Sequence, residues 1–141
     1  MIYLDASAIV AVLGRESDGD VLLSRLEAAG PPFLVSPAGL FEAVLGLAAK
    51  KARDANKPLD ASLIGLAQSS VAQFVADIGA SEIAITPAIG HAAIEAAKRY
   101  SRAVGHAAAL NFGDCLAYAC AREHGTSLLY KGNDFSETDI A

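Results

Sequence analysis

The sequence contains no tryptophan, and all aromatic residues together make up only 6% of its 141 positions. A core built from it must therefore rely on leucine, isoleucine, valine and alanine. There are only two cysteines, Cys115 and Cys120, which lie five positions apart in one apolar segment. That spacing is poor for a disulfide within a helix, and no neighbouring His or Cys completes a zinc-binding pattern. We therefore expect a reduced protein in the cytoplasm.

Positive charge and long apolar runs are also scarce. Eleven Lys and Arg residues against sixteen Asp and Glu residues give a formal net charge of −5. This balance argues against broad, nonspecific nucleic-acid binding through a basic surface, although a bound metal ion can supply positive charge locally. No apolar run reaches the roughly eighteen residues that a membrane span needs, and no basic leader precedes Asp5, so we expect neither a span nor a signal peptide.

Hydrophobic residues make up 53% of the chain and charged residues 19%, a balance typical of a folded globular protein. Brief apolar segments predict four strands, at 1–4, 33–35, 83–85 and 127–129. Capping residues and prolines predict helices between them, at 8–13, 18–29, 37–52, 60–77, 87–104 and 112–124. Wholly apolar strands joined by long helical connections indicate a parallel sheet covered on both faces. We expect one α/β domain over 1–141, with three α/β/α layers and about four to five strands.

Three carboxylates stand out because their neighbours are apolar: Asp5, Glu42 and Asp114. Asp5 ends the first predicted strand, and the other two lie early in predicted helices. Ligands of open parallel sheets bind beyond the carboxyl ends of the strands, where the following helices also begin. Asp5 and Glu42 therefore converge by topology, and Asp114 joins them only if its helix packs nearby. Grouped carboxylates repel one another unless a cation neutralises them, and their oxygens suit magnesium or manganese.

Each of these acids also has a purely structural explanation. Asp5 can cap the helix that follows it. Asp114 lies three residues after the predicted cap Asn111, where an acid stabilises the helix dipole. Glu42 can lie on the exposed face of its helix, with its apolar neighbours facing elsewhere. The interpretation as a site rests on the three occurring together.

Four stretches of the sequence carry a resemblance that spans essentially the whole chain. They are MIYLDASA at 1–8, Glu42 in the second strand–helix unit, LNFGDCLAYA at 110–119 and LLYKGNDF at 128–135. In this order and spacing the chain resembles the PIN-domain ribonucleases, specifically the VapC-type toxins of bacterial toxin–antitoxin pairs. The resemblance implies a compact α/β/α domain and a magnesium-dependent endoribonuclease that hydrolyses RNA phosphodiesters with a metal-activated water.

The resemblance also implies roles for individual residues and partners. Asp5 and Asp114 would be the principal metal ligands, Glu42 would complete the cluster directly or through water, and Ser7 would orient Asp5 or a metal-bound water. Such toxins are usually homodimers, inhibited by a cognate VapB antitoxin in a heterotetramer or larger complex. Their targets are often transfer or ribosomal RNA.

The sequence departs from the family pattern at one corner of this site. Many members carry a fourth acid soon after the last strand, and Gly132 occupies that position here. Asp134 is the nearest substitute, Asn133 is another, and Asp139 is a weaker one. The alternative for Asp134 is a loop residue that forms a turn with Gly132 and Asn133.

Basic residues near the predicted site are candidates for contacting RNA. We expect Arg99, Arg102, His106 and Lys131 to be the relevant ones, because the first three precede the segment that leads to Asp114 and Lys131 follows the last strand. Tyr100 can stack on a base. The alternative is that basic residues at helix ends only complement the helix dipole.

Two other functions compete with the ribonuclease. A haloacid-dehalogenase-like phosphatase also has an acid after its first strand, but it needs a second acid two residues later, where Ser7 stands here. A PIN-like domain without catalysis, acting only as a binding module, would explain the missing acid at Gly132. Finally, the apolar helix at 61–78 has more apolar surface than one core stripe needs, which predicts either a partner-binding face or a central core helix.

Overall fold

Four short strands, all parallel, form a sheet in the order β3–β2–β1–β4. They are β1 (Ile2–Leu4), β2 (Phe33–Val35), β3 (Ser81–Glu82) and β4 (Ser127–Leu129). The computed structural model describes residues 1–140 of the chain. Ile2 at the start of β1 lies opposite both Phe33 and Ser127, so β1, β2 and β4 begin in step. Their carboxyl ends consequently lie at one edge of the sheet.

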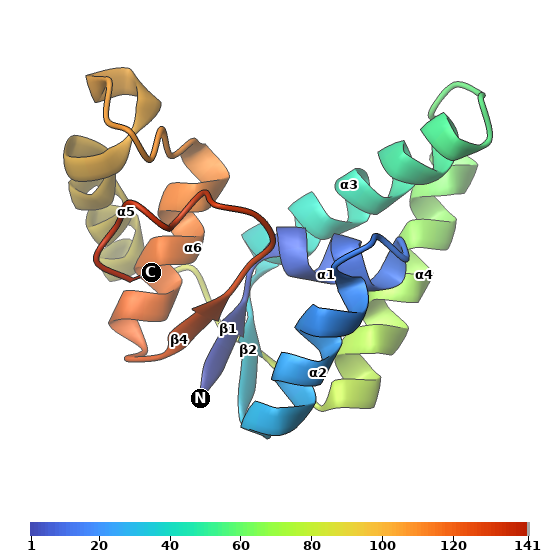
Figure 1. The fold of residues 1–141 in the computed structure, drawn as a ribbon, viewed down its shortest axis with the longest axis horizontal. Coiled ribbons are helices and arrows are strands. Elements are labelled where there is room, and N and C mark those ends of the chain that lie inside the picture. Colours follow the sequence, from blue (N-terminus) through green and yellow to red (C-terminus); the bar gives the residue numbers. More distant parts are fainter. Residues whose placement is uncertain (141) are drawn as a thin grey trace.

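Six α-helices cover the two faces of this sheet (Figure 1). One side carries α1 (Ala6–Leu13), α2 (Gly19–Ala29), α3 (Pro37–Asp54) and α4 (Ala61–Ile78), and the other carries α5 (Pro87–Tyr100) and α6 (Phe112–Glu123). A short 3-10 helix, η1 (Arg102–Val104), follows α5. The predicted α/β/α arrangement with a parallel sheet is confirmed.

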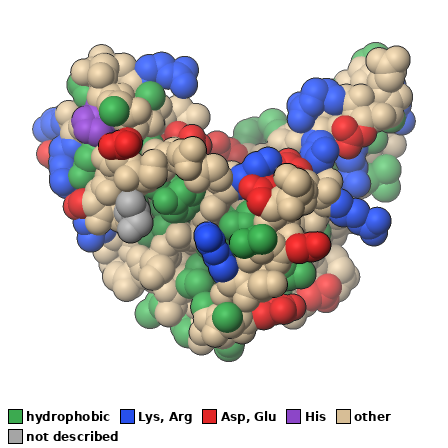
Figure 2. All heavy atoms as spheres, viewed as in Figure 1, with side chains coloured by type: hydrophobic (Ala, Val, Ile, Leu, Met, Phe, Trp, Pro, Cys, Tyr) green, Lys and Arg blue, Asp and Glu red, His purple; other side chains and the backbone are tan. Residues whose placement is uncertain are grey.

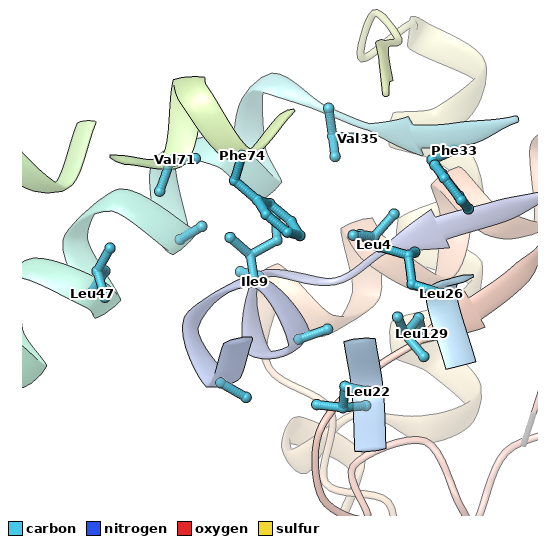
Figure 3. Packing of buried hydrophobic residues seen from close by; sticks show 14 of the residues in the cluster. Leu4, Ile9, Leu22, Leu26, Phe33, Val35, Leu47, Val71, Phe74 and Leu129 are labelled. Atoms are coloured by element: carbon cyan, nitrogen blue, oxygen red, sulfur yellow. The ribbon is translucent and has the colours of Figure 1, made fainter. Parts of the chain in front are cut away.

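Alternate residues of each strand face opposite sides of the sheet, which divides the core into two clusters. Leu4, Phe33 and Val35 pack against Ile9 and Phe74 on the side of α1–α4 (Figure 3). On the other side, Tyr3 and Leu34 pack against α5, α6 and Phe135 of the C-terminal segment. β1 and β2 are apolar throughout because both faces are buried, whereas β3 at the edge of the sheet is polar and exposed.

Several helices begin at capping residues. Ser36, Asp60, Thr86 and Asn111 each accept a hydrogen bond from a backbone N–H of the first turn of the next helix. Asp18 occupies the cap position of α2 but forms no such bond. Asp5 caps α1, so this helix begins at Ala6 and not at residue 8 as predicted.

Two further predicted boundaries are wrong. The strand predicted at 83–85 is displaced to Ser81–Glu82, because its partner β2 ends at Val35 and the Ile83 N–H makes the last bond to the Val35 carbonyl, at 2.8 Å. The helix predicted to reach 104 ends at Tyr100. There, extended Ser101 pairs with Leu110, which lies just before α6.

Helix α4 buries one stripe and exposes the rest. Leu63, Val71 and Phe74 are buried against the sheet and α3, whereas Leu66 is 61% exposed. By length and composition alone α4 qualifies as a weak candidate for a membrane span, but the core helices of globular proteins pass the same test. Its buried stripe supports the predicted core helix, and its exposed apolar residues leave the predicted partner-binding face open.

Candidate active site

Asp5 lies where β1 ends and α1 begins, and its carboxylate is held by Ser7. The backbone N–H of Ser7 donates to Oδ2 of Asp5 at 3.1 Å, and the Ser7 hydroxyl donates to the same oxygen. The hydroxyl in turn accepts a bond from the backbone N–H of Lys131 at 3.0 Å, which fixes the direction of its own proton. Asp5 is buried, and this burial raises its pKa despite the bonds from Ser7.

Glu42 reaches the same place from α3, on the neighbouring strand–helix unit. Its carboxylate lies directly against the Cα of Gly113 in α6, where an added Cβ would be 2.5 Å from the Glu42 Cδ. Partial desolvation raises the pKa of Glu42, and the charges of Asp5 and Asp114 raise it further. Within residues 1–140 no hydrogen bond or ion pair engages this carboxylate. Glu42 therefore faces the two aspartates with no positive partner.

Asp114 comes from the first turn of α6 and is fixed by a capping box. Its backbone N–H donates to the Asn111 side chain at 2.9 Å, and its carboxylate accepts from the Asn111 backbone N–H at 3.1 Å. Burial raises the pKa of Asp114 to about 6, with added repulsion from Asp134 and Asp5. The capping role that the sequence offered as an alternative is therefore present, and it orients the carboxylate beside the other acids.

Asp134 lies near Asp5 and Asp114, on the segment that follows β4. Its charge raises the pKa of both Asp5 and Asp114. Gly132, at the position of the missing acid, has φ +81°, a left-handed conformation that favours glycine. Asn133 accepts two bonds from Ser136 through its backbone carbonyl, so it contributes to a turn. Asp139 lies elsewhere, among Tyr118, Arg99 and Arg122, and these partners lower its pKa to about 2.

Asp5, Glu42, Asp114 and Asp134 form what we term the acid cluster, at the carboxyl edge of the sheet. Figure 2 shows the molecule hollowed between the arm of α5 and η1 and the arm of α3 and α4, with acidic side chains along the floor. Among the described residues no three acids, histidines or cysteines are close enough to hold one metal ion as they stand. The oxygen donors and their mutual repulsion suit a hard cation.

Comparisons with known proteins agree with this architecture. The family model described as "PIN domain" matches residues 2–141. The chain belongs to the PIN domain family. A VapC ribonuclease of Rhizobium meliloti is 44% identical over 141 residues, with 99% of both chains covered. Ribonuclease VapC of Mycolicibacterium smegmatis is 33% identical over 140 residues, covering 99% of this chain and 98% of its own.

A solved structure supports the fold of this PIN domain independently. The crystal structure of VapC20 from Mycobacterium tuberculosis, described as a sarcin–ricin loop cleaving toxin, aligns with a TM-score of 0.70 at 19% identity. It covers all of this chain and 97% of that one. The predicted resemblance to VapC-type members of the PIN family is confirmed.

The predicted RNA-contacting residues of this PIN domain have different surroundings. Arg99 bonds to the Tyr100 hydroxyl and pairs with Asp139, away from the acid cluster. The Lys131 ammonium pairs with Glu16 in the loop between α1 and α2, so that only its backbone N–H serves the cluster through Ser7. His106 is half-buried with its ring edge against Tyr100. Arg102 is exposed, and its charge acts on Asp114.

Sequence reasoning overlooked two contributions to this site. Gly113 provides the space that Glu42 occupies, and only the packing of α6 against α3 reveals it. Glu16 pairs with the ammonium of Lys131, whose backbone N–H donates to the Ser7 hydroxyl. In the sequence Glu16 is one acid among sixteen, and no pattern connects it with Lys131, 115 positions later.

The raised pKa of Asp114 predicts an inverted pH dependence of stability. The folded-state pKa of about 6 lies above the ordinary value of 3.8, so the folded state binds this proton more tightly than the unfolded state. The stabilisation is complete below the ordinary pKa and is lost as the pH rises through about 6. In chelator we therefore expect the thermal midpoint to fall between about pH 4 and pH 7 more steeply in the unchanged chain than in Asp114→Asn. Equal slopes in thermal denaturation of the two proteins would contradict this prediction.

Proposed function

We propose that the chain is an endoribonuclease, the toxin of a VapBC-type pair, with 1–141 acting as a single PIN domain. The observation that carries the proposal is the convergence of Asp5, Glu42 and Asp114. They come from three separate elements at one edge of the sheet. Burial raises the pKa of each, the charge of Asp5 raises the pKa of Glu42 and of Asp114, and the charge of Asp114 raises that of Glu42. A structural role for each acid alone does not explain why three lie together without a cationic partner of their own. The VapC ribonucleases to which the chain is similar support RNA as the substrate.

The cofactor that we propose is magnesium, with manganese as an alternative. PIN-domain VapC ribonucleases generally use divalent metal ions. Asp5 and Asp114 would be the main ligands, Glu42 would bind directly or through water, and Asp134 would take the place of the acid missing at Gly132. When bound, such an ion polarises a phosphoryl oxygen and lowers the pKa of a water molecule.

The chain's own residues prepare this site in three ways. Ser7 holds Asp5 with two donors that both bond to Oδ2, so neither of them engages Oδ1. The capping box with Asn111 likewise holds the carboxylate of Asp114 by a hydrogen bond. The absence of a side chain at Gly113 lets Glu42 approach both. Holding Asp5 and Asp114 in this way reduces the rearrangement needed before an RNA phosphate binds.

We propose a cognate VapB-type antitoxin as partner, a homodimer as the toxin's own state, and a heterotetramer or larger complex with the antitoxin. The proposed location is the cytoplasm. Transfer or ribosomal RNA is the proposed substrate.

The decisive experiment incubates the purified chain with transfer RNA and with ribosomal RNA, in magnesium and in excess chelator. We expect endonucleolytic fragments in magnesium, none in chelator, and recovery when magnesium or manganese is restored. Cleavage that persists in chelator would refute the metal site. No cleavage of any RNA would favour the binding module that the glycine at position 132 suggests.

A further inference from the structure

The first turn of α6 presents a phenylalanine to solvent beside the acid cluster. Phe112 is 84% exposed, more than any other large hydrophobic residue of the described chain, and it lies two positions before Asp114. Covering an exposed aromatic ring with a flat apolar surface is favourable, because it removes the ring from water. The residue is therefore placed to bind something that comes to the active site.

A groove of about 600 Å³ lies between α5 and the start of α6, with Phe112 in its wall. Its floor is apolar, made by residues such as Ala97, Leu110 and Leu116. Arg102 and Asn111 also line it, and both are next to Asp114: Asn111 is its capping partner, and the charge of Arg102 acts on it. The groove therefore adjoins the acid cluster and shares its boundary.

Arg102 is the basic residue of this region that the fold leaves free. Arg99 is paired with Asp139, and Lys131 with Glu16. Within residues 1–140 the Arg102 side chain forms neither an ion pair nor a hydrogen bond. An exposed guanidinium at the rim of an apolar groove matches a ligand with a flat apolar part and a phosphate.

We propose that this groove binds one unpaired nucleotide next to the scissile phosphate, with its base stacked on Phe112 and a backbone phosphate held by Arg102. The proposal rests on the proposed ribonuclease function and specifies the form of RNA that the site accepts. A base within a duplex is stacked on its neighbours and cannot enter the groove, so loops and single strands are expected to be preferred. A second copy of this chain is the less favoured occupant, because it would bury Arg102, whose desolvation is costly without a paired acid.

The test measures binding in chelator, where cleavage does not interfere, by fluorescence anisotropy. The probes are labelled oligoadenylate, oligouridylate and a blunt RNA duplex. We expect Phe112→Ala to weaken binding of both single strands about tenfold, Phe112→Trp to retain it, and neither change to affect the duplex. An oligomer with one abasic position at the bound nucleotide should lose its sensitivity to Phe112→Ala. Arg102→Gln should weaken single-strand binding and reduce its salt dependence.

Two matched variants remove exposed apolar surface elsewhere. Val21→Ala changes the exposed side of α2, and Leu66→Ala changes α4, both outside the groove. Both should bind the single strands as the unchanged chain does. Equal losses for duplex and single strands, a shift from dimer to monomer by light scattering in Phe112→Ala, or no measurable binding of any single strand would each overturn the proposal. Because no cleavage is required, stacking on Phe112 can be established even if the chain fails to cut RNA, and cleavage that is unaffected by Phe112→Ala overturns only the subsite.

Discussion

Asp5→Asn is expected to lower the rate of RNA cleavage in magnesium about a thousandfold while leaving the fold at least as stable. The change removes one negative charge from the acid cluster and keeps the shape of the side chain. Asparagine caps helices as well as aspartate does, so α1 retains its start. The amide oxygen can accept the two bonds from Ser7, and the amide N–H groups then face the remaining acids. Repulsion within the cluster should fall, so we expect the thermal midpoint in chelator to rise.

The matched control for this variant is Asp139→Asn. Asp139 is an acid of the C-terminal segment. It pairs with Arg99 and Arg122 and lies outside the acid cluster. We expect Asp139→Asn to retain cleavage and to lower the thermal midpoint, the reverse of Asp5→Asn in both respects. Cleavage by Asp5→Asn at the rate of the unchanged chain would show that the acid cluster is not the catalytic centre.

Most of the fold could be predicted because helix caps, prolines and short apolar runs mark its helices and strands within a few residues. A proline after Ser36 and another after Thr86 specify two helix starts, and the short apolar strands indicate burial on both faces. The errors occurred where pairing with a distant segment determines the end of a helix or strand. The limit of β3 depends on where β2 ends, and the end of α5 depends on the bridge between Ser101 and Leu110.

The candidate site also has a part that local patterns predict and a part that depends on distant packing. Asp5 and Glu42 were predicted to converge because parallel topology alone brings strand ends and helix starts together. The approach of Asp114 depends on the packing of α6 beside α3, which no spacing encodes. The sequence also did not show that Arg99 is paired while Arg102 is not, because the partner of Arg99 is Asp139, 40 positions later.

Gly113→Ala is expected to reduce RNA cleavage about 10–100-fold without destabilising the fold. A Cβ at this position would overlap the carboxylate of Glu42. That carboxylate is the far end of a flexible side chain on the surface, so it can rotate away at little cost, and the collision is relieved by removing Glu42 from the cluster. Replacing glycine by alanine within a helix contributes about 0.5–1 kcal/mol of stability, which offsets the displacement.

Gly65→Ala in α4 serves as the control, because nothing lies within 4 Å of the added Cβ. It should gain similar stability and keep full activity. If Gly113→Ala acts by displacing Glu42, then Glu42→Gln alone, Gly113→Ala alone and the two together should lose nearly the same amount of activity, since each removes the same carboxylate. Additive losses in cleavage rate would mean that Gly113 serves the reaction in another way. The double-variant cycle therefore tests whether the empty space at Gly113 exists to admit the carboxylate of Glu42.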